Sequence, residues 1–209
     1  MRRTLSIVAA ALASACASTP PTSPGAERPY PCIMHPPSEL TPDFSVSQHL
    51  EAMAMGRSGG FDSVVQKHGN DLVIVGLGPA GVRAFVLKQT GDAITFEQSF
   101  GPKLPFSPRN VVVDVHRTFF KRLVVPAPPA TGAATIKGMI DDEEVEEDWR
   151  DGSLVERRFS RPGSAYRGVV RVTYGPGCTR ERCAPATTHL VNEWFDYALT
   201  ITNTDFTWL

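Results

Sequence analysis

The sequence predicts a mainly β fold, built from short antiparallel strands with one helix. From Phe44 onward, apolar residues recur with a period of two, which is typical of strands with one buried face. The alternating segments end at turn-forming Gly and Asp residues. One segment, 107–122, carries a helical stripe instead. Strands that follow one another through tight turns form antiparallel meanders, so we expect a sheet with one apolar face.

The expected strands are joined by turns that favour hairpins. The strongest signal is Asp151-Gly152, which lies between two alternating segments. Gly69 and Gly91 mark two further turns of the same kind. The segments predicted as strands are 44–54, 61–70, 71–77, 82–89, 93–98, 142–149, 154–159, 166–174, 189–194 and 195–203.

The helical segment begins at a recognisable start signal. Ser107 suits the N-cap and Pro108 suits the first helical position. Valines disfavour helix, so a strand remains an alternative for this segment. Residues 123–135 are rich in Pro and Ala and predict a loop before the second half of the meander. The apolar stripe of the helix is formed by Val112, Val115 and Phe119.

The N-terminal residues 1–16 have the form of an export signal. Two arginines precede an apolar run, which ends in small residues directly before Cys16. This arrangement resembles a bacterial lipoprotein signal, in which Cys16 would be acylated and become the first residue of the mature chain. The alternative is an ordinary secretory signal with a chance Cys. Ala17 follows the Cys, and by the same resemblance this indicates the outer membrane rather than the inner one.

Residues 17–43 contain eight prolines, which predicts a semi-extended tether. We therefore expect three parts: a lipoprotein signal peptide over 1–16, a Pro-rich tether over 17–43 and a β domain over 44–209. The formal net charge is −1, so nothing favours a nucleic-acid partner. No run of 18 apolar residues is present, and no membrane-spanning helix is expected.

The cysteines predict one short disulfide. Cys178 and Cys183 bracket a small loop, and an exported chain meets an oxidising compartment, so we expect them to be joined. A metal pair is the alternative, but the spacing and the lack of a second ligand pair make it a weak one. Cys32 is then left as the odd thiol in the tether.

The segment Gly76-Leu-Gly-Pro-Ala-Gly81 matches a dinucleotide-binding fingerprint but lacks its context. Such a site needs a strand, a glycine turn and a helix within a βαβ unit. Residues 82–89 read as a strand, and no β-α alternation follows. We interpret the glycines as a kinked turn between two strands, and we expect no cofactor.

The polar residues give no enzyme signature. The five histidines lack a second His or Cys at ligand spacing, so no metal site is expected. Asp114 and His116 are two apart, which on a helix points them to different faces, and we interpret them as surface or lid polarity. The acidic run 141–148 is interpreted as a solvated edge strand. We expect a protein that is not an enzyme, with an exported hydrolase as a remote alternative.

Several short motifs resemble those of a known family. It is an uncharacterised family of bacterial outer-membrane lipoproteins, several of which lie in aryl-polyene pigment gene clusters, and it is similar in architecture to the lipoprotein-localisation factors LolA and LolB. The motifs are Gly81-x-Arg83-x-Phe85, Leu104-Pro105 with Pro108-Arg109 and Asp114, Trp149-x-Asp151-Gly152-x-Leu154-x-Glu156-Arg157-x-Phe159, and Tyr197-x-Leu199-x-Ile201.

The resemblance implies an incomplete, strongly curved antiparallel β-barrel that holds a hydrophobic cavity under a helical lid. It also implies a hydrophobic ligand (a lipid, an acylated protein or an aryl-polyene) that is delivered to the outer membrane from its periplasmic face, with a periplasmic LolA-like carrier as a possible partner. The residues alone are equally compatible with a solid core, which would make the chain a structural or interaction lipoprotein. The residues expected to line the cavity are Phe85, Leu87, Ile94, Phe96, Val170, Val172, Leu199 and Ile201, with Val112, Val115 and Phe119 on the lid.

Overall fold

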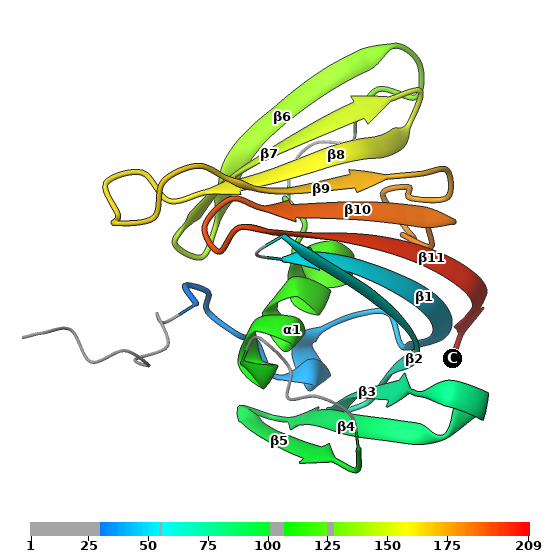
Figure 1. Cartoon of the computed structure of the whole chain (residues 1–209). Helices are drawn as coiled ribbons and strands as arrows, with labels where there is room; N and C mark the ends of the chain where they lie inside the picture. Colours follow the sequence, from blue (N-terminus) through cyan, green and yellow to red (C-terminus); the bar gives the residue numbers. More distant parts are fainter. Residues whose placement is uncertain (1–29, 55, 101–106, 125–127) are drawn as a thin grey trace, which may run out of the picture.

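The computed structural model describes residues 30–54, 56–100, 107–124 and 128–209. These residues form one antiparallel sheet of eleven strands that curls around a single short helix (Figure 1). The strand order is β5-β4-β3-β2-β1-β11-β10-β9-β8-β7-β6, so β5 and β6 are the two edges and the sheet does not close into a barrel. The predicted fold class, a curved and incomplete antiparallel barrel with a helix, is confirmed.

The sheet consists of two meanders that are consecutive in sequence. The first runs from β1 to β5 and the second from β6 to β11. Every pair of neighbouring strands is antiparallel, as the hairpin turns predict. The strands are β1 (Phe44–Ala54), β2 (Arg57–His68), β3 (Asp71–Leu77), β4 (Arg83–Thr90), β5 (Ala93–Gln98), β6 (Ala133–Ile140), β7 (Glu143–Arg150), β8 (Ser153–Ser160), β9 (Val170–Tyr174), β10 (Thr187–Asn192) and β11 (Tyr197–Trp208).

The two meanders are joined by pairing of the first strand with the last. β1 pairs with β11 along its whole length, from Phe44 opposite Trp208 to Ala54 opposite Tyr197. The register shifts once, between Ser47 and Gln48, where a β-bulge bends the strand. This pairing places two long strands, which come from opposite ends of the described chain, side by side in the centre of the sheet.

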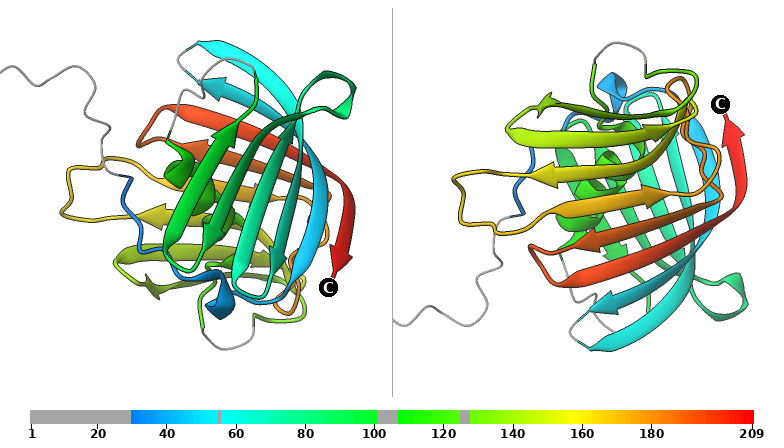
Figure 2. Two further views of the ribbon diagram at one scale, coloured as in Figure 1. Left: turned by 90° about the horizontal axis from the view of Figure 1, so that it is seen from below. Right: turned by 90° about the horizontal axis from the view of Figure 1, so that it is seen from above.

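The helix lies on the concave face of the sheet, between the two meanders (Figure 2). α1 (Pro108–Val115) begins after Ser107 and continues into a π-helical turn, η3 (His116–Phe120). The turn ends where the backbone N–H of Lys121 donates to the carbonyl of His116 at 2.8 Å. The predicted helix is therefore present, and both its start signal and its apolar stripe were read correctly. None of the helices in the described part of the chain is long and apolar enough to cross a membrane.

The described part of the chain has three apolar clusters in its interior, and the two larger ones belong to one meander each. Val113, with Tyr30 and Cys32, forms a third and smaller cluster on the helix. The cluster of the first meander includes Phe44, Val46, Leu72, Leu87, Val112 and Phe119. The cluster of the second meander includes Val145, Leu154, Phe159, Val170, Val172 and Leu190.

The glycine-rich segment is a turn between strands, as the sequence analysis expects. β3 ends at Leu77, and a short 3-10 turn, η2 (Pro79–Gly81), leads into β4. The register of β3 and β4 shifts between Gly76 and Leu77. A side chain at Gly76 would overlap the ring of Phe85, so the glycine makes room for an aromatic residue across the strand pair.

Three expectations about polar and connecting segments are wrong. The acidic run forms β7, which is the second strand from the edge, and Glu143 and Glu147 are fully buried. Asp114 and His116 are also buried, not surface polarity, because the helix is enclosed on several sides. The sequence did not predict β6, which begins inside the expected Pro/Ala loop.

The packed part of the chain begins earlier than Phe44. Residues 30–43, which the sequence assigned to the tether, include the buried side chains of Tyr30, Cys32 and Leu40. A short 3-10 turn, η1 (Pro37–Glu39), leads from this segment into β1. The prolines therefore keep the segment extended, while its few apolar residues hold it against the helix.

Candidate ligand pocket

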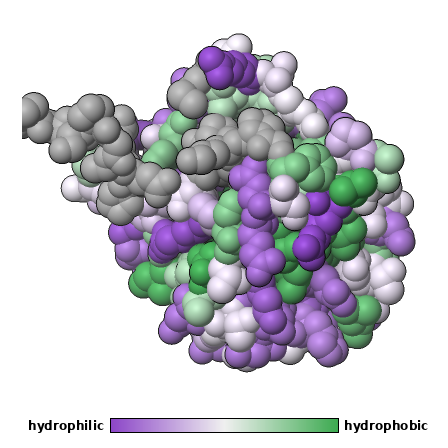
Figure 3. All heavy atoms as spheres, turned by 60° about the horizontal axis from the view of Figure 1, so that its bottom comes forward, coloured by the Kyte–Doolittle hydropathy of each residue, from purple (hydrophilic) through white to green (hydrophobic). Residues whose placement is uncertain are grey.

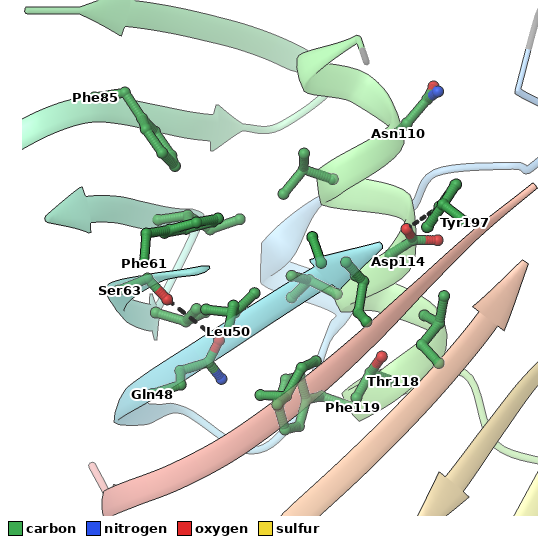
Figure 4. Close-up of a pocket in the computed structure, with 18 residues that line it drawn as sticks. Gln48, Leu50, Phe61, Ser63, Phe85, Asn110, Asp114, Thr118, Phe119 and Tyr197 are labelled. Carbon is green, nitrogen blue, oxygen red and sulfur yellow. Dashed lines mark hydrogen bonds between the residues drawn. The ribbon is translucent and has the colours of Figure 1, made fainter. Parts of the chain in front are cut away.

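A cavity of about 70 Å³ lies between α1 and the concave face of the sheet (Figure 4). The sheet side is built mainly by inward-facing residues of β1 and β2, with Ile74 of β3, Phe85 of β4 and residues of β10 and β11. The helix side is built by residues that are one and four positions apart, as expected for one helical face. These helix residues are Asn110, Val111, Asp114, Val115, Thr118 and Phe119.

Most of the pocket wall is apolar. Phe61 and Phe85 meet edge to face with their ring centroids 5.7 Å apart, which is a favourable aromatic geometry. Leu199 and Ile201 of β11 close the opposite side. Phe119 packs against Phe44, whose ring centroid lies 5.3 Å away, and so connects the pocket to the core beneath it.

Polar groups occur at two ends of the pocket. At one end, the hydroxyl of Ser63 donates to Oε1 of Gln48 at 3.4 Å, and Nε2 of Gln48 donates to Asn203 at 3.2 Å. At the other end lie Thr118, which is buried, and Asp114. Figure 4 shows the Gln48 and Asp114 ends separated by the apolar side chains. Such an arrangement suits a molecule with a long apolar part.

Asp114 is the centre of a buried hydrogen-bonded cluster. The hydroxyl of Tyr30 donates to Oδ1 of Asp114 and the hydroxyl of Tyr197 donates to Oδ2. Nδ2 of Asn192 donates to both phenol oxygens, at 2.5 Å for Tyr30 and 3.0 Å for Tyr197. Burial raises the pKa of Asp114 to about 6, although Arg117 and the two phenols favour the charged form. The carboxyl group therefore titrates close to neutral pH.

The C-terminal end of the helix is held by buried ion pairs. Nη2 of Arg117 lies 2.5 Å from Oε1 of Glu143, and both side chains are fully buried. Beside them, Nε of Arg157 lies 2.8 Å from Oε1 of Glu147, with both side chains almost completely buried. Nη1 of Arg157 also donates to the backbone carbonyl of Arg117 at 3.1 Å. Strands β7 and β8 thus hold the end of the helix through charged groups that are buried and paired with each other.

His116 holds another side of the helix. Its Nε2 lies 2.8 Å from Oε1 of Gln89 on β4, and both side chains are buried. Burial lowers the pKa of His116 to about 3, and nearby cationic groups, Lys121 first among them, act in the same direction. The imidazole is therefore neutral at physiological pH and acts as a hydrogen-bonding group inside the protein.

The structure brings five of the eleven predicted cavity residues to the pocket: Phe85, Val115, Phe119, Leu199 and Ile201. Leu87, Ile94, Phe96 and Val112 pack in the apolar cluster of the first meander instead, and Val170 and Val172 pack in the cluster of the second. Four of these six residues are buried in a filled part of the core, whereas Ile94 and Phe96 on the edge strand β5 are only partly buried and pack against it.

Several pocket residues were missed by the sequence analysis. They include Leu50, Phe61, Val65 and Ile74, which lie at alternating positions of β1, β2 and β3. The period-two pattern marks each as inward-facing, but it carries no information on which inward residues meet the helix. The missing signal is the pairing of β1 with β11, which places these strands opposite α1.

The cysteines of the structure separate into a bonded pair and a buried thiol. Cys178 and Cys183 form a disulfide at the loop before β10, and Cys32 is a free, buried thiol. Cys16, the predicted lipidation site, lies outside the described residues. Within the described ranges, no group of three or more His, Cys, Asp or Glu residues is placed to hold a metal ion.

The fold and the pocket together define an open, curved antiparallel sheet that encloses a small apolar pocket against one helix. The family model described as "Protein of unknown function (DUF3261)" matches residues 45–205, and the chain therefore belongs to this family. The expected membership of a family without an assigned function is thus confirmed, whereas the link to aryl-polyene clusters stays a prediction. No curated protein matches the chain.

Three solved structures are similar to this chain over most of its length. One is a LolA superfamily protein from Nitrosomonas europaea, with 12% identity and a TM-score of 0.42. Another is a putative outer membrane lipoprotein-sorting protein domain from Vibrio parahaemolyticus, with 8% identity and a TM-score of 0.43. The third is a DUF1329 family protein from Desulfovibrio piger, with 11% identity and a TM-score of 0.42. Each of these three matches covers 79% of this chain and 85% of the chain in the solved structure.

Proposed function

We propose that this protein binds the apolar part of a lipid-like molecule in the pocket between α1 and the concave face of the sheet. The observation that supports this is the pocket itself, whose wall is apolar over most of its extent and polar only at its ends. Each methylene group that enters such a site gains about 0.8 kcal/mol. A ligand with several methylene groups therefore gains several kcal/mol from the burial of its apolar part.

The size of the pocket sets a condition on binding. A dry cavity of about 150 Å³ holds benzene, and this pocket has about half of that volume. An acyl or polyene chain therefore enters only if the helix moves away from the sheet. On the face shown in Figure 3, the described hydrophobic residues lie in several small groups bordered by hydrophilic ones. We expect a larger apolar surface to become accessible only when the pocket opens.

The leader sequence supports a location for this activity. If Cys16 is acylated, the domain is held at the periplasmic face of the outer membrane, where a lipid, an acylated protein or an aryl-polyene is delivered. A soluble LolA-like carrier is the partner that such a location favours. The protein would act by binding and release, with no catalytic step.

The alternative function is that of a structural or interaction lipoprotein with a packed core. The small volume and the buried ion pairs that hold the helix end favour this alternative. It differs from the proposal in a measurable way, because a packed core takes up no ligand.

A pair of tryptophan substitutions on one strand tests the proposal. Leu199→Trp adds a large side chain inside the pocket, whereas Ala198→Trp adds the same side chain to the opposite face of β11. We expect the wild type and Ala198→Trp to bind dansylaminoundecanoic acid, and Leu199→Trp to bind it at least tenfold more weakly, in fluorescence titrations. Native mass spectrometry of the purified chain checks for a lipid that is already bound. Absence of uptake by the wild type, with no co-purified lipid, would favour the packed core.

A further inference from the structure

Residues 30–35, which we call the strap, lie along the side of α1 that faces away from the pocket. In Figure 1 this blue segment passes close to α1 before the chain enters β1. Three of the helix residues that contact it, Arg109, Val113 and Arg117, are spaced by four and form one row along the helix. The pocket residues Val111 and Val115 lie on the opposite side. The helix is therefore held between the strap and the sheet.

Two arginines of the helix bind three consecutive carbonyl groups of the strap. Nη1 of Arg109 donates to the carbonyl of Tyr30 at 2.6 Å, and its Nη2 donates to the carbonyl of Cys32 at 2.7 Å. Nη2 of Arg117 donates to the carbonyl of Pro31 at 2.7 Å. Hydrogen bonds from a charged donor are stronger than neutral ones, so these contacts fix the strap backbone on the helix.

Further contacts bury the strap and connect it to the sheet. Tyr30 and Cys32 are 3% and 8% exposed, and they pack against Val113. The carbonyl of His35 accepts a hydrogen bond from Nε2 of Gln89 on β4 at 2.9 Å. The strap thus runs from the back of the helix to the first meander and encloses α1 from outside.

Asp114 connects the strap to the pocket. One of its carboxylate oxygens accepts from Tyr30 of the strap, and the other accepts from Tyr197. Tyr197 belongs to β11, and both Tyr197 and Asp114 line the pocket. A movement of the strap therefore changes the contacts of Asp114, which is part of the pocket wall.

We propose that the strap is the gate of the ligand pocket: while residues 30–35 are bound to the back of α1 the pocket stays closed, and their release lets the helix move and the ligand enter. This inference rests on the ligand pocket proposed above. It adds to the helical lid that the sequence analysis expected: the helix is still the part that moves, and the strap is the part that holds it closed.

Cys32 supplies a reporter of strap release. It is a free thiol, and Cys178 and Cys183 are bonded to each other. In a full chain with Cys16→Ser, Cys32 is therefore the only thiol that reacts with Ellman's reagent. Burial raises the pKa of Cys32, which also slows its reaction while the strap is bound.

The test compares two arginine substitutions in this full chain. Arg109→Ala removes two hydrogen bonds to the strap, whereas the control Arg122→Ala removes one hydrogen bond to the carbonyl of Arg180, away from the strap. For Arg109→Ala we expect Cys32 to react at least tenfold faster, and the uptake and release of dansylaminoundecanoic acid, followed by stopped-flow fluorescence, to accelerate by a similar factor. For Arg122→Ala we expect both rates to stay within about twofold of the wild type.

A milder variant serves as a second test in case Arg109→Ala does not fold. Tyr30→Phe removes the hydroxyl that reaches Asp114 and keeps the packed ring, so smaller changes in the same direction are expected. Faster reaction of Cys32 with unchanged ligand rates would overturn the gate. So would unchanged Cys32 rates in both strap variants. If the wild type takes up no ligand at all, the proposed function fails, and the Cys32 rates still show separately whether the strap opens.

Discussion

The two meanders of the sheet contact the same helix in different ways. The second meander binds the end of the helix through the buried ion pair of Arg117 with Glu143, and Arg157, itself paired with Glu147, donates to the backbone carbonyl of Arg117. The first meander faces the helix mainly across apolar side chains, and it lines the pocket together with β10 and β11 of the second meander. Its main polar contact with the helix is neutral, between His116 and Gln89.

This difference indicates which part of the interior can open. A buried ion pair is costly to break, because separation leaves a charge without a partner and without water. Apolar contacts have no preferred direction, and a ligand with an apolar surface can replace them. We therefore expect β7 and β8 to hold the helix end in place while the helix moves relative to β1–β4.

The largest effect on stability is expected from removing the buried ion pair that joins the second meander to the helix. Glu143→Ala leaves the buried charge of Arg117 without its partner at 2.5 Å, so the free energy of unfolding should fall by about 3–5 kcal/mol. Urea unfolding followed by circular dichroism measures this change. The matched control is Glu146→Ala on the same strand, whose pair with Arg158 is partly exposed and should contribute no more than about 1 kcal/mol. Equal losses in the two variants would show that the helix end is not held by the buried pair.

The sequence predicted the local parts of this comparison well. The alternation of apolar residues and the Asp151-Gly152 turn specify hairpins, and Ser107-Pro108 marks the helix start, because these features depend on neighbouring residues only. The pairing of β1 with β11 joins residues more than 140 positions apart, and no local pattern reports it. The division of inward residues into pocket and filled core follows from that pairing, so it was also not predictable.

The buried charges show a second limit of the sequence patterns. Glu143 and Glu147 lie at alternating positions with Val145 and Trp149, so the pattern of the strand was present. We did not recognise this pattern in the sequence, because a run of carboxylates is usually solvated. Their partners Arg117 and Arg157 come from the helix and from β8, and a carboxylate enters a protein interior only when such a partner is supplied. The distribution of charge along one segment therefore does not predict its burial.

The pH dependence of stability gives a second test, because burial raises the pKa of Asp114 on the helix and lowers the pKa of its neighbour His116. The pKa of Asp114 is about 6 in the folded protein and about 3.9 when unfolded, so its contribution to stability falls as the pH rises from 4 to 6. The pKa of His116 is about 3 when folded and about 6.5 when unfolded, so its contribution falls as the pH drops from 6.5 to 3. Between pH 4 and 6 the two contributions oppose each other.

Replacing one of these two groups should reveal the contribution of the other to the pH dependence of the unfolding free energy. In His116→Gln, the unfolding free energy should decline relative to the wild type by about 1.4 kcal/mol per pH unit, or about 3 kcal/mol from pH 4 to pH 6. In Asp114→Asn it should rise relative to the wild type over the same range. Urea titrations at pH 4, 5 and 6 measure both slopes. Slopes parallel to that of the wild type would mean that neither group has the shifted pKa described here.

The smallest effect concerns a hydroxyl group in the second meander. Thr188 on β10 is fully buried, and its hydroxyl oxygen has no hydrogen-bond partner among the described residues. Because a buried polar group without a partner is unfavourable, Thr188→Val should raise the unfolding free energy by about 1 kcal/mol while conserving the shape of the side chain. Thr173→Val on the neighbouring β9 is the control, since that side chain is only half-buried and should change stability by less than about 0.5 kcal/mol. The gain at Thr188 should leave ligand uptake unchanged, because Thr188 does not line the pocket. A loss of stability instead would show that the hydroxyl group is hydrogen-bonded in solution.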